Sequence, residues 1–384
     1  MSTLKVDNIR HNSATSDAIT MASDGTCTAN ITSNYSNRSV VYNGAMKIAQ
    51  RGTSFTGITA SGTFPVDRFR FHVGSLGTWT LSQSTDVPTG QGLSHSIKCD
   101  VTTANASPSG TAYARIDQRF EGQDLQRFCK GTANAKNFAV SFWVKSPKTG
   151  THIVQLQDQD NSRTVSKAYT VSSANTWEKK ELIFPADTTG AFDNDNGGSL
   201  FLCFYLAVGT GYQGGTLQTT WGTPVNNTRA TGQVNVADST SNDFYLTGVQ
   251  MEASSYCSEF EHRSYDEELK RCKRYALVIG SNQAIGTGSA YNSTNININI
   301  YNQFRATPTY SKTTGGNGYT WVVYVGSSGV ATASPTVAVA SDSNPNYCLR
   351  LYVQNCHNSL TAGQAVWALT HDGGGEQIVL SAEL

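Results

Sequence analysis

The sequence has 384 residues, a formal net charge of zero and only 15% charged residues, against about 25% in an average soluble domain. Without a basic excess, the composition argues against binding to nucleic acid or to an anionic membrane. Long amphipathic helices need many charged side chains, so the deficit, together with 35 glycines and 10% aromatic residues, favours an all-β fold.

The N-terminus and the cysteines indicate a chain made in a reducing cytoplasm. The opening MSTLKVDNIRHNS has no apolar segment of the kind found in secretory signals. No stretch approaches the ~18 consecutive apolar residues of a membrane span, so we expect no membrane insertion. The eight cysteines include no C-x-x-C pair, which predicts free thiols rather than disulfides or a zinc site.

Residues 1–37 predict an N-terminal β segment. Leu4 and Val6 alternate with polar neighbours, and Asp24-Gly25 is typical of a hairpin turn. A segment below about 40 residues does not bury a core alone. We therefore expect it to serve in trimerisation and attachment, three copies sharing one apolar axis. A disordered leader is the alternative.

Residues 38–259 predict a jelly-roll or β-sandwich domain, because short strand patterns recur between turn-rich segments without helical interludes. Every second residue of 138–145 is apolar, which places these side chains on one face. The run 200–208 is almost continuously apolar and predicts a strand buried on both faces. Further strands are expected at 152–156, 177–184 and 244–251.

Residues 260–275 predict a short helical connector. Charges are dense there, Ser264 and Glu267 form a capping-box pattern, and the last turn is basic, which complements a helix C-terminus. Residues 276–384 return to strand patterns and predict a smaller C-terminal β domain. Its strands are expected at 296–300, 321–325, 347–353, 365–369 and 377–380.

Several stretches resemble tail-fibre-like structural proteins of phages, especially phages of marine bacteria and cyanobacteria. LKVDNI followed by AITMASDG resembles their N-terminal segment. NGAMKIAQRGTSF (43–55) with DRFRF (67–71) resembles the start of their central domain. FYLTGVQMEAS (244–254) leading into FEHRSYDEELKRCKRY (260–275) resembles its end, and the terminal IVLSAEL resembles fibre C-termini. The two stretches 43–55 and 244–275 are the most specific.

The resemblance implies a virion fibre protein, synthesised in the host cytoplasm and commonly homotrimeric. It implies a carbohydrate-binding-module-like jelly roll in the middle and a variable distal tip. The N-terminal segment would join other tail or capsid proteins, and the distal domains would meet a host cell-surface glycan.

Two aromatic residues in the loop 209–224 are candidates for sugar stacking. Tyr212 and Trp221 lie there among Gly and Thr. Exposed aromatic faces bind the C–H groups of a pyranose ring, but an aromatic side chain can equally anchor a loop of this length to the body. Both interpretations stay open at this point.

The expected distal tip supplies three further candidates. Tyr319 and Trp321 follow GGNG, and His371 lies in HDGGG. Binding residues concentrate in loops held by a rigid scaffold, which makes these positions candidates for receptor contact.

Evidence for catalysis is weak. A glycan hydrolase needs two carboxylates close together, and the candidate pairs are Asp158 with Asp160 and Asp193 with Asp195. Each pair lies in a turn-like segment, where Asp is expected for local hydrogen bonding. No G-x-S-x-G elbow, P-loop or H-E-x-x-H motif occurs. We expect no enzyme activity and no organic cofactor.

A structural calcium ion is the one cofactor with a candidate site. FDNDNGG (192–198) clusters hard oxygen ligands without a full EF-hand pattern. Asp193, Asp195 and Asp243 are the candidate ligands, with a plain surface turn as the alternative.

The leading hypothesis is a trimeric fibre that attaches a phage to its host through a glycan. The alternatives are a purely architectural capsid or tail fibre or adaptor without a ligand, and a glycan-degrading tail enzyme.

Overall fold

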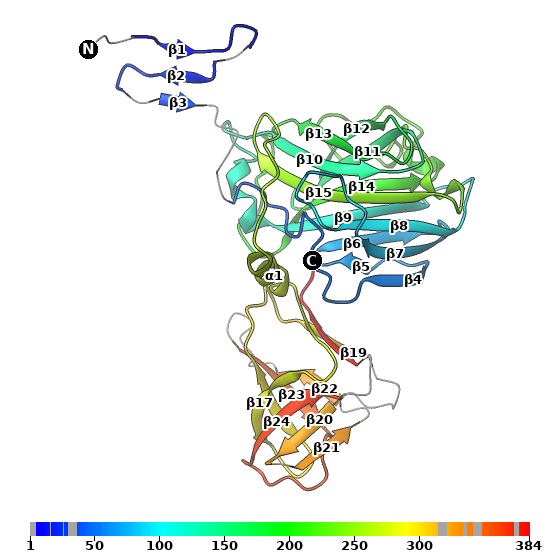
Figure 1. The fold of residues 1–384 in the computed structure, drawn as a ribbon, viewed down its shortest axis with the longest axis vertical. Coiled ribbons are helices and arrows are strands. Elements are labelled where there is room, and N and C mark those ends of the chain that lie inside the picture. The colour runs from blue at the N-terminus through cyan, green and yellow to red at the C-terminus, as the bar shows by residue number, and fades with distance from the viewer. Residues whose placement is uncertain are drawn as a thin grey trace.

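The computed structural model describes residues 5–15, 17–25, 27–29, 37–313, 321–326, 328–332, 336–340, 348–371 and 376–384. These residues form strands almost throughout, with one α-helix between the two larger bodies, which confirms the all-β fold with a helical connector. Figure 1 shows a thin N-terminal arm, a large central sandwich and a smaller C-terminal body following one another along the molecule.

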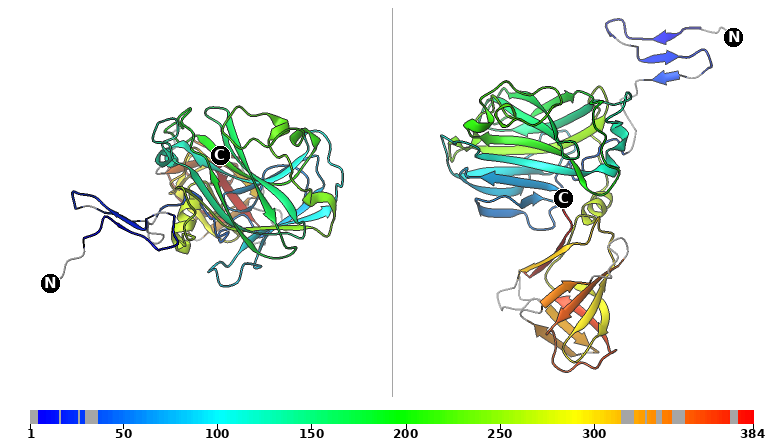
Figure 2. Two further views of the ribbon diagram at one scale, coloured as in Figure 1. Left: turned by 90° about the horizontal axis from the view of Figure 1, so that it is seen from above. Right: turned by 180° about the vertical axis from the view of Figure 1, so that it is seen from behind.

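The N-terminal arm is a three-stranded antiparallel sheet. Its strands are β1 (Asn8–Ile9), β2 (Ile19–Met21) and β3 (Cys27–Ala29). None of its described side chains is fully buried, and Ile9 and Met21 stay largely exposed. Figure 2 shows the arm projecting away from the sandwich in both views. Trimerisation through this arm stays a prediction.

Two antiparallel six-stranded sheets form the central sandwich. The first, called the β10 sheet, has the order β13-β10-β15-β8-β7-β4, with β4 (Ser54–Ile58), β7 (Thr78–Ser84), β8 (Ser96–Thr103), β10 (Phe138–Lys145), β13 (Glu178–Phe184) and β15 (Asp243–Ala253). The second, called the β14 sheet, has the order β12-β11-β14-β9-β6-β5, with β5 (Thr63–Val66), β6 (Phe69–Gly74), β9 (Tyr113–Glu121), β11 (Gly150–Asp158), β12 (Arg163–Val171) and β14 (Gly198–Val208). Short 3₁₀ turns connect them: η1 (Gly122–Asp124), η2 (Gln126–Phe128), η3 (Thr210–Tyr212), η4 (Asn226–Thr228) and η5 (Val236–Asp238).

The core lies between the two sheets and follows from alternation along each strand. The apolar side chains at every second position of β10 are fully buried, as predicted. Phe142 on β10 meets Phe204 on β14 nearly edge-on, with ring centroids 5.0 Å apart, so the two sheets interlock there. A side chain of this size contributes roughly 1.5–3 kcal/mol by leaving water.

Residues 209–235, called the 209–235 loop, fold back over the outer face of the β14 sheet. Thr164 on β12 exchanges both backbone hydrogen bonds with Gly222, at 2.8 and 3.1 Å. Beneath the loop lies a small second buried cluster, made of Ile153, Tyr205, Val208 and Ala230. The loop therefore explains why β14 is apolar on both faces, as its sequence predicts.

The connector helix α1 (Tyr265–Lys273) begins at the predicted cap. Ser264 Oγ accepts a hydrogen bond from the Glu267 backbone N–H at 3.2 Å. Lys270, Arg271 and Lys273 lie in the last turn, where positive charge is favoured by the helix dipole. No helix in the described part of the chain is long and apolar enough to cross a bilayer.

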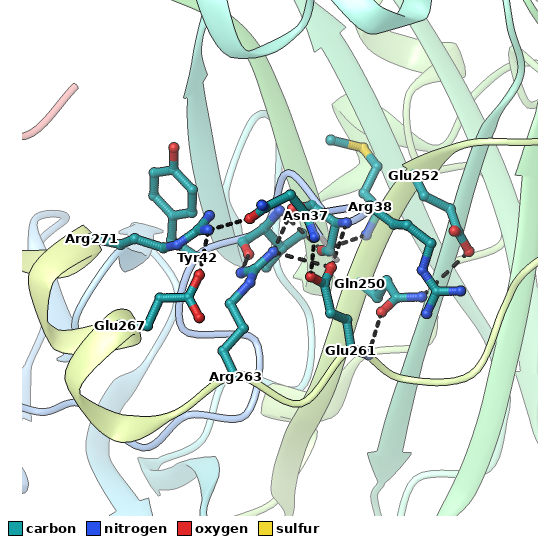
Figure 3. Close-up of polar contacts among 12 residues, drawn as sticks. Asn37, Arg38, Tyr42, Gln250, Glu252, Glu261, Arg263, Glu267 and Arg271 are labelled. Carbon is teal, nitrogen blue, oxygen red and sulfur yellow. Dashed lines mark hydrogen bonds and ion pairs between the residues drawn. The ribbon is translucent and has the colours of Figure 1, made fainter. Parts of the chain in front are cut away.

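The chain enters and leaves the sandwich at the same place, which we call the collar, residues 37–43 and 259–271. Figure 3 shows Glu261 and Arg263 reaching the incoming segment at Asn37 and Arg38. Arg263 donates to the carbonyl oxygens of Val41 and Ser39 at 2.8 and 2.6 Å, and Glu261 accepts from the Ser39 N–H at 2.9 Å. Glu268 accepts from the Asn43 N–H at 2.7 Å. The two stretches that carry the phage-fibre resemblance thus contact each other.

The C-terminal body contains two sheets. A three-stranded sheet has the order β16-β25-β19, with β16 (Ala276–Ile279), β19 (Thr309–Thr313) and β25 (Gln377–Ser381). A seven-stranded sheet has the order β21-β20-β24-β17-β18-β23-β22, with β17 (Ala284–Ala290), β18 (Ile296–Ile300), β20 (Trp321–Val325), β21 (Ser328–Thr332), β22 (Thr336–Val339), β23 (Leu349–Gln354) and β24 (Ala365–Thr370). The isoleucines of β18 are buried and its asparagines face outward, as the strict alternation predicts.

The last residues return to the central sandwich and join the two bodies. Glu383 forms ion pairs with Arg68 and, at 3.1 Å, with Arg51. The Arg68 guanidinium lies 3.3 Å from the centroid of the Tyr275 ring at the end of the connector. Arg119 on β9 donates to the carbonyl oxygen of Leu384 at 2.9 Å. All eight cysteines are free thiols in this structure.

Candidate functional site

The structure separates the two aromatic candidates of the 209–235 loop. Trp221 packs against the sandwich core, 5.7 Å from the Phe138 ring, and its Nε1–H donates to the Pro185 carbonyl at 2.7 Å. Trp221 is therefore the anchor of the loop rather than a surface for a ligand. Tyr212 instead lines a pocket between the loop and the β14 sheet.

Two of the three distal-tip candidates, Trp321 and His371, lie within the described residues. Trp321 is fully buried in the C-terminal core, and its Nε1–H donates to Tyr310 Oη at 3.0 Å, so its ring does not reach a ligand at the surface. His371 is half-buried and lies 3.8 Å from Glu376. Tyr319 lies outside the described residues.

The calcium candidates lie in separate places. Asp193 and Asp195 are exposed in the turn after β13, where Asp195 Oδ1 accepts from the Gly197 N–H at 2.7 Å. Asp243 begins β15 and pairs with Lys98 at 3.3 Å. Among the described residues, no group of three His, Cys, Asp or Glu side chains could hold a metal ion. The structure thus does not bring the proposed ligands together.

A cation does occupy an oxygen-lined site close to that turn, and it is the ammonium of Lys130. Its Nζ lies 2.6 Å from Asp158 Oδ2 and 3.1 Å from Asp187 Oδ2, and it donates to the carbonyls of Thr189 and Gly190. Burial raises the pKa of Asp187, but hydrogen bonds from Arg163, the Thr189 backbone and Lys130 hold it below its ordinary value. Asp158 is thereby committed to a structural ion pair, not to a catalytic pair with Asp160.

The pocket beneath the loop, called the Tyr212 pocket, encloses about 220 Å³. At ~30 Å³ for each molecule of liquid water, this is the space of roughly seven waters, which suits one sugar ring better than a chain. Its lining combines three tyrosines with one amide and two guanidinium groups: Tyr113, Arg115, Gln157, Tyr205, Tyr212 and Arg229.

Two glycines place Tyr212 over the sheet. The loop start lies directly against the 109–110 turn, where a Cβ at Gly209 would lie 2.5 Å, and one at Gly211 2.7 Å, from a carbonyl oxygen. Only glycine tolerates so close an approach. The Tyr212 ring then meets Tyr113 of β9 edge-on, with centroids 6.2 Å apart and an interplanar angle of 85°.

The floor of the pocket is a hydrogen-bonded row. Tyr205 Oη donates to Gln155 Oε1 at 3.0 Å, and Gln157 Nε2 donates to the same oxygen at 2.7 Å. Burial raises the pKa of the Tyr205 phenol, which keeps it neutral. Gln157 Oε1 accepts no hydrogen bond from another described residue, so it can accept one from a ligand hydroxyl.

Beside the pocket, Asp117 on β9 is surrounded by basic groups. His72 Nε2 lies 3.0 Å from its carboxylate, and Arg115 and Arg119 lie at 3.5 and 3.6 Å. Burial raises the pKa of Asp117, but the His72 hydrogen bond and the two arginines bring it below its ordinary value. Burial lowers the pKa of His72, so the imidazole is neutral at pH 7. Asp117 stays ionised and orients Arg115.

Arg229 supplies a second positive charge to the pocket. Its backbone is fixed, since its carbonyl accepts from Ser166 Oγ at 2.8 Å. Its Nε is buried without a hydrogen-bond partner, and its guanidinium forms no ion pair with another described residue. A guanidinium in this state favours a planar anion such as a carboxylate, which it can bind through two hydrogen bonds.

Sequence reasoning found Tyr212 and missed the rest of the pocket. Arg229 lies in a polar loop, where an arginine is expected to be solvated. One available signal was the alternation along 113–116, in which Tyr113 and Arg115 fall on one face and Ala114 and Ile116 on the other. The pairing of that face with residues 157 and 205 is long-range and leaves no local signal.

Comparisons with known proteins give a fold likeness only. No protein-family model and no curated protein match the chain. Among solved structures, it is similar to the enzymatically active domain of tailspike protein 4 of bacteriophage CBA120, with 15% identity, a TM-score of 0.29, and 58% of this chain and 23% of that chain covered. The match therefore spans less than a quarter of the tailspike chain.

Carbohydrate-binding modules also match the chain. TmCBM61, solved with β-1,4-galactotriose, has 9% identity and a TM-score of 0.28 over 56% of this chain and 99% of its own. The family 11 module from Clostridium thermocellum, solved with a mixed-linked tetrasaccharide, has 11% identity and a TM-score of 0.26 over 53% and 96%. At these TM-scores, no conclusion about a ligand follows for this chain.

Proposed function

We propose that this chain is a phage virion fibre protein that attaches the particle to its bacterial host by binding a cell-surface glycan. The observation that supports this best is the Tyr212 pocket. It offers tyrosine rings, a free amide oxygen and a guanidinium group in a space suited to one sugar ring. These are the groups that bind the faces, hydroxyls and acidic substituents of sugars.

The charges around the pocket define the sugar more closely. Both charged residues of its lining are arginines, Arg115 and Arg229. Of the two, only Arg115 forms an ion pair with a carboxylate, that of Asp117. We propose a terminal sugar that carries a carboxylate. Long-range attraction plays little part, because the whole chain has no net charge.

The fibre assignment is supported by the resemblance of 43–55 and 244–275 to phage fibres and by the arm with its exposed Ile9 and Met21. We propose that three chains associate through this arm, which joins them to tail or capsid proteins. Three weak sugar contacts on one fibre would then gain strength by effective concentration.

Calorimetric titration of the full chain with glucuronic acid, galacturonic acid and sialic acid tests the pocket, with glucose as the neutral control. We expect one acidic sugar to bind better than glucose. Arg229→Ala should weaken that binding at least about tenfold, since hydrogen bonds to charged groups contribute about 1.5–3 kcal/mol. Tyr212→Ala should weaken it by several-fold. Lys136→Ala, which removes an exposed positive charge elsewhere, is the matched control. Equal binding by Arg229→Ala and the parent chain would refute the assignment.

Three further measurements address the fibre role and its rivals. Light scattering should give the mass of a trimer, and a monomer would contradict the assembly. The protein should block phage adsorption to host cells, whereas an architectural fibre would not. Release of oligosaccharide from host capsule or lipopolysaccharide would identify a glycan-degrading enzyme instead.

A further inference from the structure

A second surface with sugar-binding chemistry lies on the C-terminal body, on the outer face of its seven-stranded sheet. The strand register places one row of side chains across this face. Tyr324 pairs with Trp367, Trp367 with Thr287, and Thr287 with Asn299. Residues paired across a sheet project to the same face, so the row runs across four neighbouring strands.

The aromatic end of the row is a stacked and partly exposed pair of rings. The rings of Trp367 and Tyr324 stack with centroids 4.5 Å apart and an interplanar angle of 24°, and Trp367 remains 39% exposed. Gly329 on β21 makes this possible, because a Cβ there would lie 2.6 Å from the Tyr324 ring. The other tryptophan of this body, Trp321, is fully buried in the core. Trp367 is therefore the tryptophan of this body that a ligand can reach.

The polar part of the row has unused hydrogen-bonding capacity. Together with Trp367 and one charged residue, Arg350, four uncharged polar side chains line a hollow of about 800 Å³: Thr287, Ser289, Asn297 and Asn299. None of these four forms a side-chain hydrogen bond with another described residue. They stand on the rigid strands β17 and β18, so they are oriented before any ligand arrives.

We propose that this surface, called the Trp367 platform (Tyr324, Trp367, Thr287, Ser289, Asn297 and Asn299), binds an internal stretch of a neutral glycan chain. An exposed indole suits the C–H face of a hexose, and the amides and hydroxyls beside it suit the ring hydroxyls. The hollow contains no carboxylate and a single charged residue, Arg350, and it is larger than the Tyr212 pocket, at about 800 against 220 Å³. This inference shares the glycan class of the proposed function but uses a separate site.

The probes are cellohexaose, maltohexaose and β-1,4-galactohexaose, added to the full chain, with glucose for comparison. We expect at least one hexaose to bind better than glucose and to change tryptophan fluorescence. Trp367→Ala should weaken that binding about tenfold or more, and Asn299→Ala by several-fold. Tyr301→Ala, which removes a 78% exposed aromatic side chain of the same body, should leave binding unchanged. Circular dichroism and thermal melting confirm that each variant is folded.

The outcomes separate this site from the Tyr212 pocket. Hexaose binding that is unaffected by Trp367→Ala, or that is lost in Arg229→Ala, overturns the platform. So does a failure of all three hexaoses to bind, and in that case acidic-sugar binding at the Tyr212 pocket can still hold. A change of molecular mass in Trp367→Ala, without any effect on glycan binding, would show that the occupant is a second copy of this chain.

Discussion

The central sandwich and the C-terminal body differ in how many charged side chains they bury. The sandwich fully buries a set of them: Asp67, Arg68, Asp117, Glu121, Lys130, Asp158, Asp187 and Glu252. Among the described residues of the C-terminal body, only Glu376 is a fully buried charged residue. The outer faces differ in the same sense, since the Tyr212 pocket contains two arginines and the Trp367 platform is lined mainly by uncharged groups.

This difference teaches that overall composition says little about local electrostatics. A chain with few charged residues has placed many of them inside one domain, where each needs a partner because water is excluded. Those pairs hold the sandwich face in one arrangement, as Asp117 does for Arg115. On the C-terminal face, the strand register aligns the side chains of the Trp367 platform. We therefore expect the two bodies to respond differently to loss of a charge and to acid.

The largest expected effect comes from removal of the buried ammonium. Lys130→Met leaves Asp158 buried without its cation, while Asp187 keeps Arg163, and should lower the free energy of unfolding by about 3–5 kcal/mol. Hydrogen exchange measured by mass spectrometry should show lost protection in the central sandwich and little change in the C-terminal body. Lys136→Met, at an exposed position, should change stability by less than about 0.5 kcal/mol. Equal loss of hydrogen-exchange protection in both bodies would contradict the proposed difference between them.

Acid should also act on the sandwich first, through His152. Burial, and to a lesser degree nearby Lys180, lowers its pKa to about 4 although its hydrogen bond to Lys148 opposes this. Unfolded histidine titrates near ~6.5, so the unfolded chain binds more protons between these values. The free energy of unfolding should therefore fall as the pH drops from 6.5 toward 4. The total loss should be about 3 kcal/mol.

Urea unfolding at pH 7, 6 and 5 measures this loss. His152→Gln should flatten the dependence on pH, whereas His11→Gln, in the exposed arm, should leave it as it is. The described histidines of the C-terminal body, His357 and His371, are only half-buried. If the stability of His152→Gln still depended on pH as in the parent chain, another group would be responsible for that dependence.

The connector belongs to neither core and should respond more weakly. Ser264→Ala removes the cap of α1 and should cost about 1 kcal/mol, seen as faster hydrogen exchange over residues 265–273. Ser264→Asp retains a capping oxygen and should behave like the parent chain. If Ser264→Ala destabilised either β body as strongly as the helix, the connector would be part of that body.

The smallest effect is expected at the surface pair of α1. Arg271 lies 2.7 Å from Glu267 one turn earlier and also contacts Asn37 at the collar. Arg271→Ala should cost about 0.3–0.5 kcal/mol, less at high salt, because such pairs are screened. Thermal melting in low and high salt measures it. A loss above about 1 kcal/mol would mean that the Asn37 contact dominates.

Local patterns were sufficient to predict much of the fold. The alternation in 138–145 and 296–300 predicts which side chains are buried, and the Ser264 cap predicts where α1 begins. These features depend on neighbours within a few residues. Residues 200–208 predict a doubly covered strand, but not that the 209–235 loop supplies the cover.

The site was harder to predict, because it depends on contacts between distant segments. Tyr212 was a candidate from its glycine-rich loop, yet Trp221 in the same loop is an anchor and Trp321 lies in a core. Sequence places an aromatic residue on a strand or loop but does not say which face becomes covered. Trp367 lies within an ordinary strand pattern, and only the register with Tyr324 distinguishes it.

For the fibre role proposed above, the collar has a mechanical consequence. The chain enters the sandwich at 37–43 and leaves it at 259–271, and Glu261 and Arg263 bind the incoming segment to the outgoing one. A pulling force between the arm and the C-terminal body therefore loads these contacts together with those that Glu383 and Leu384 make with the sandwich. The binding face should keep its shape under tension until the collar itself gives way.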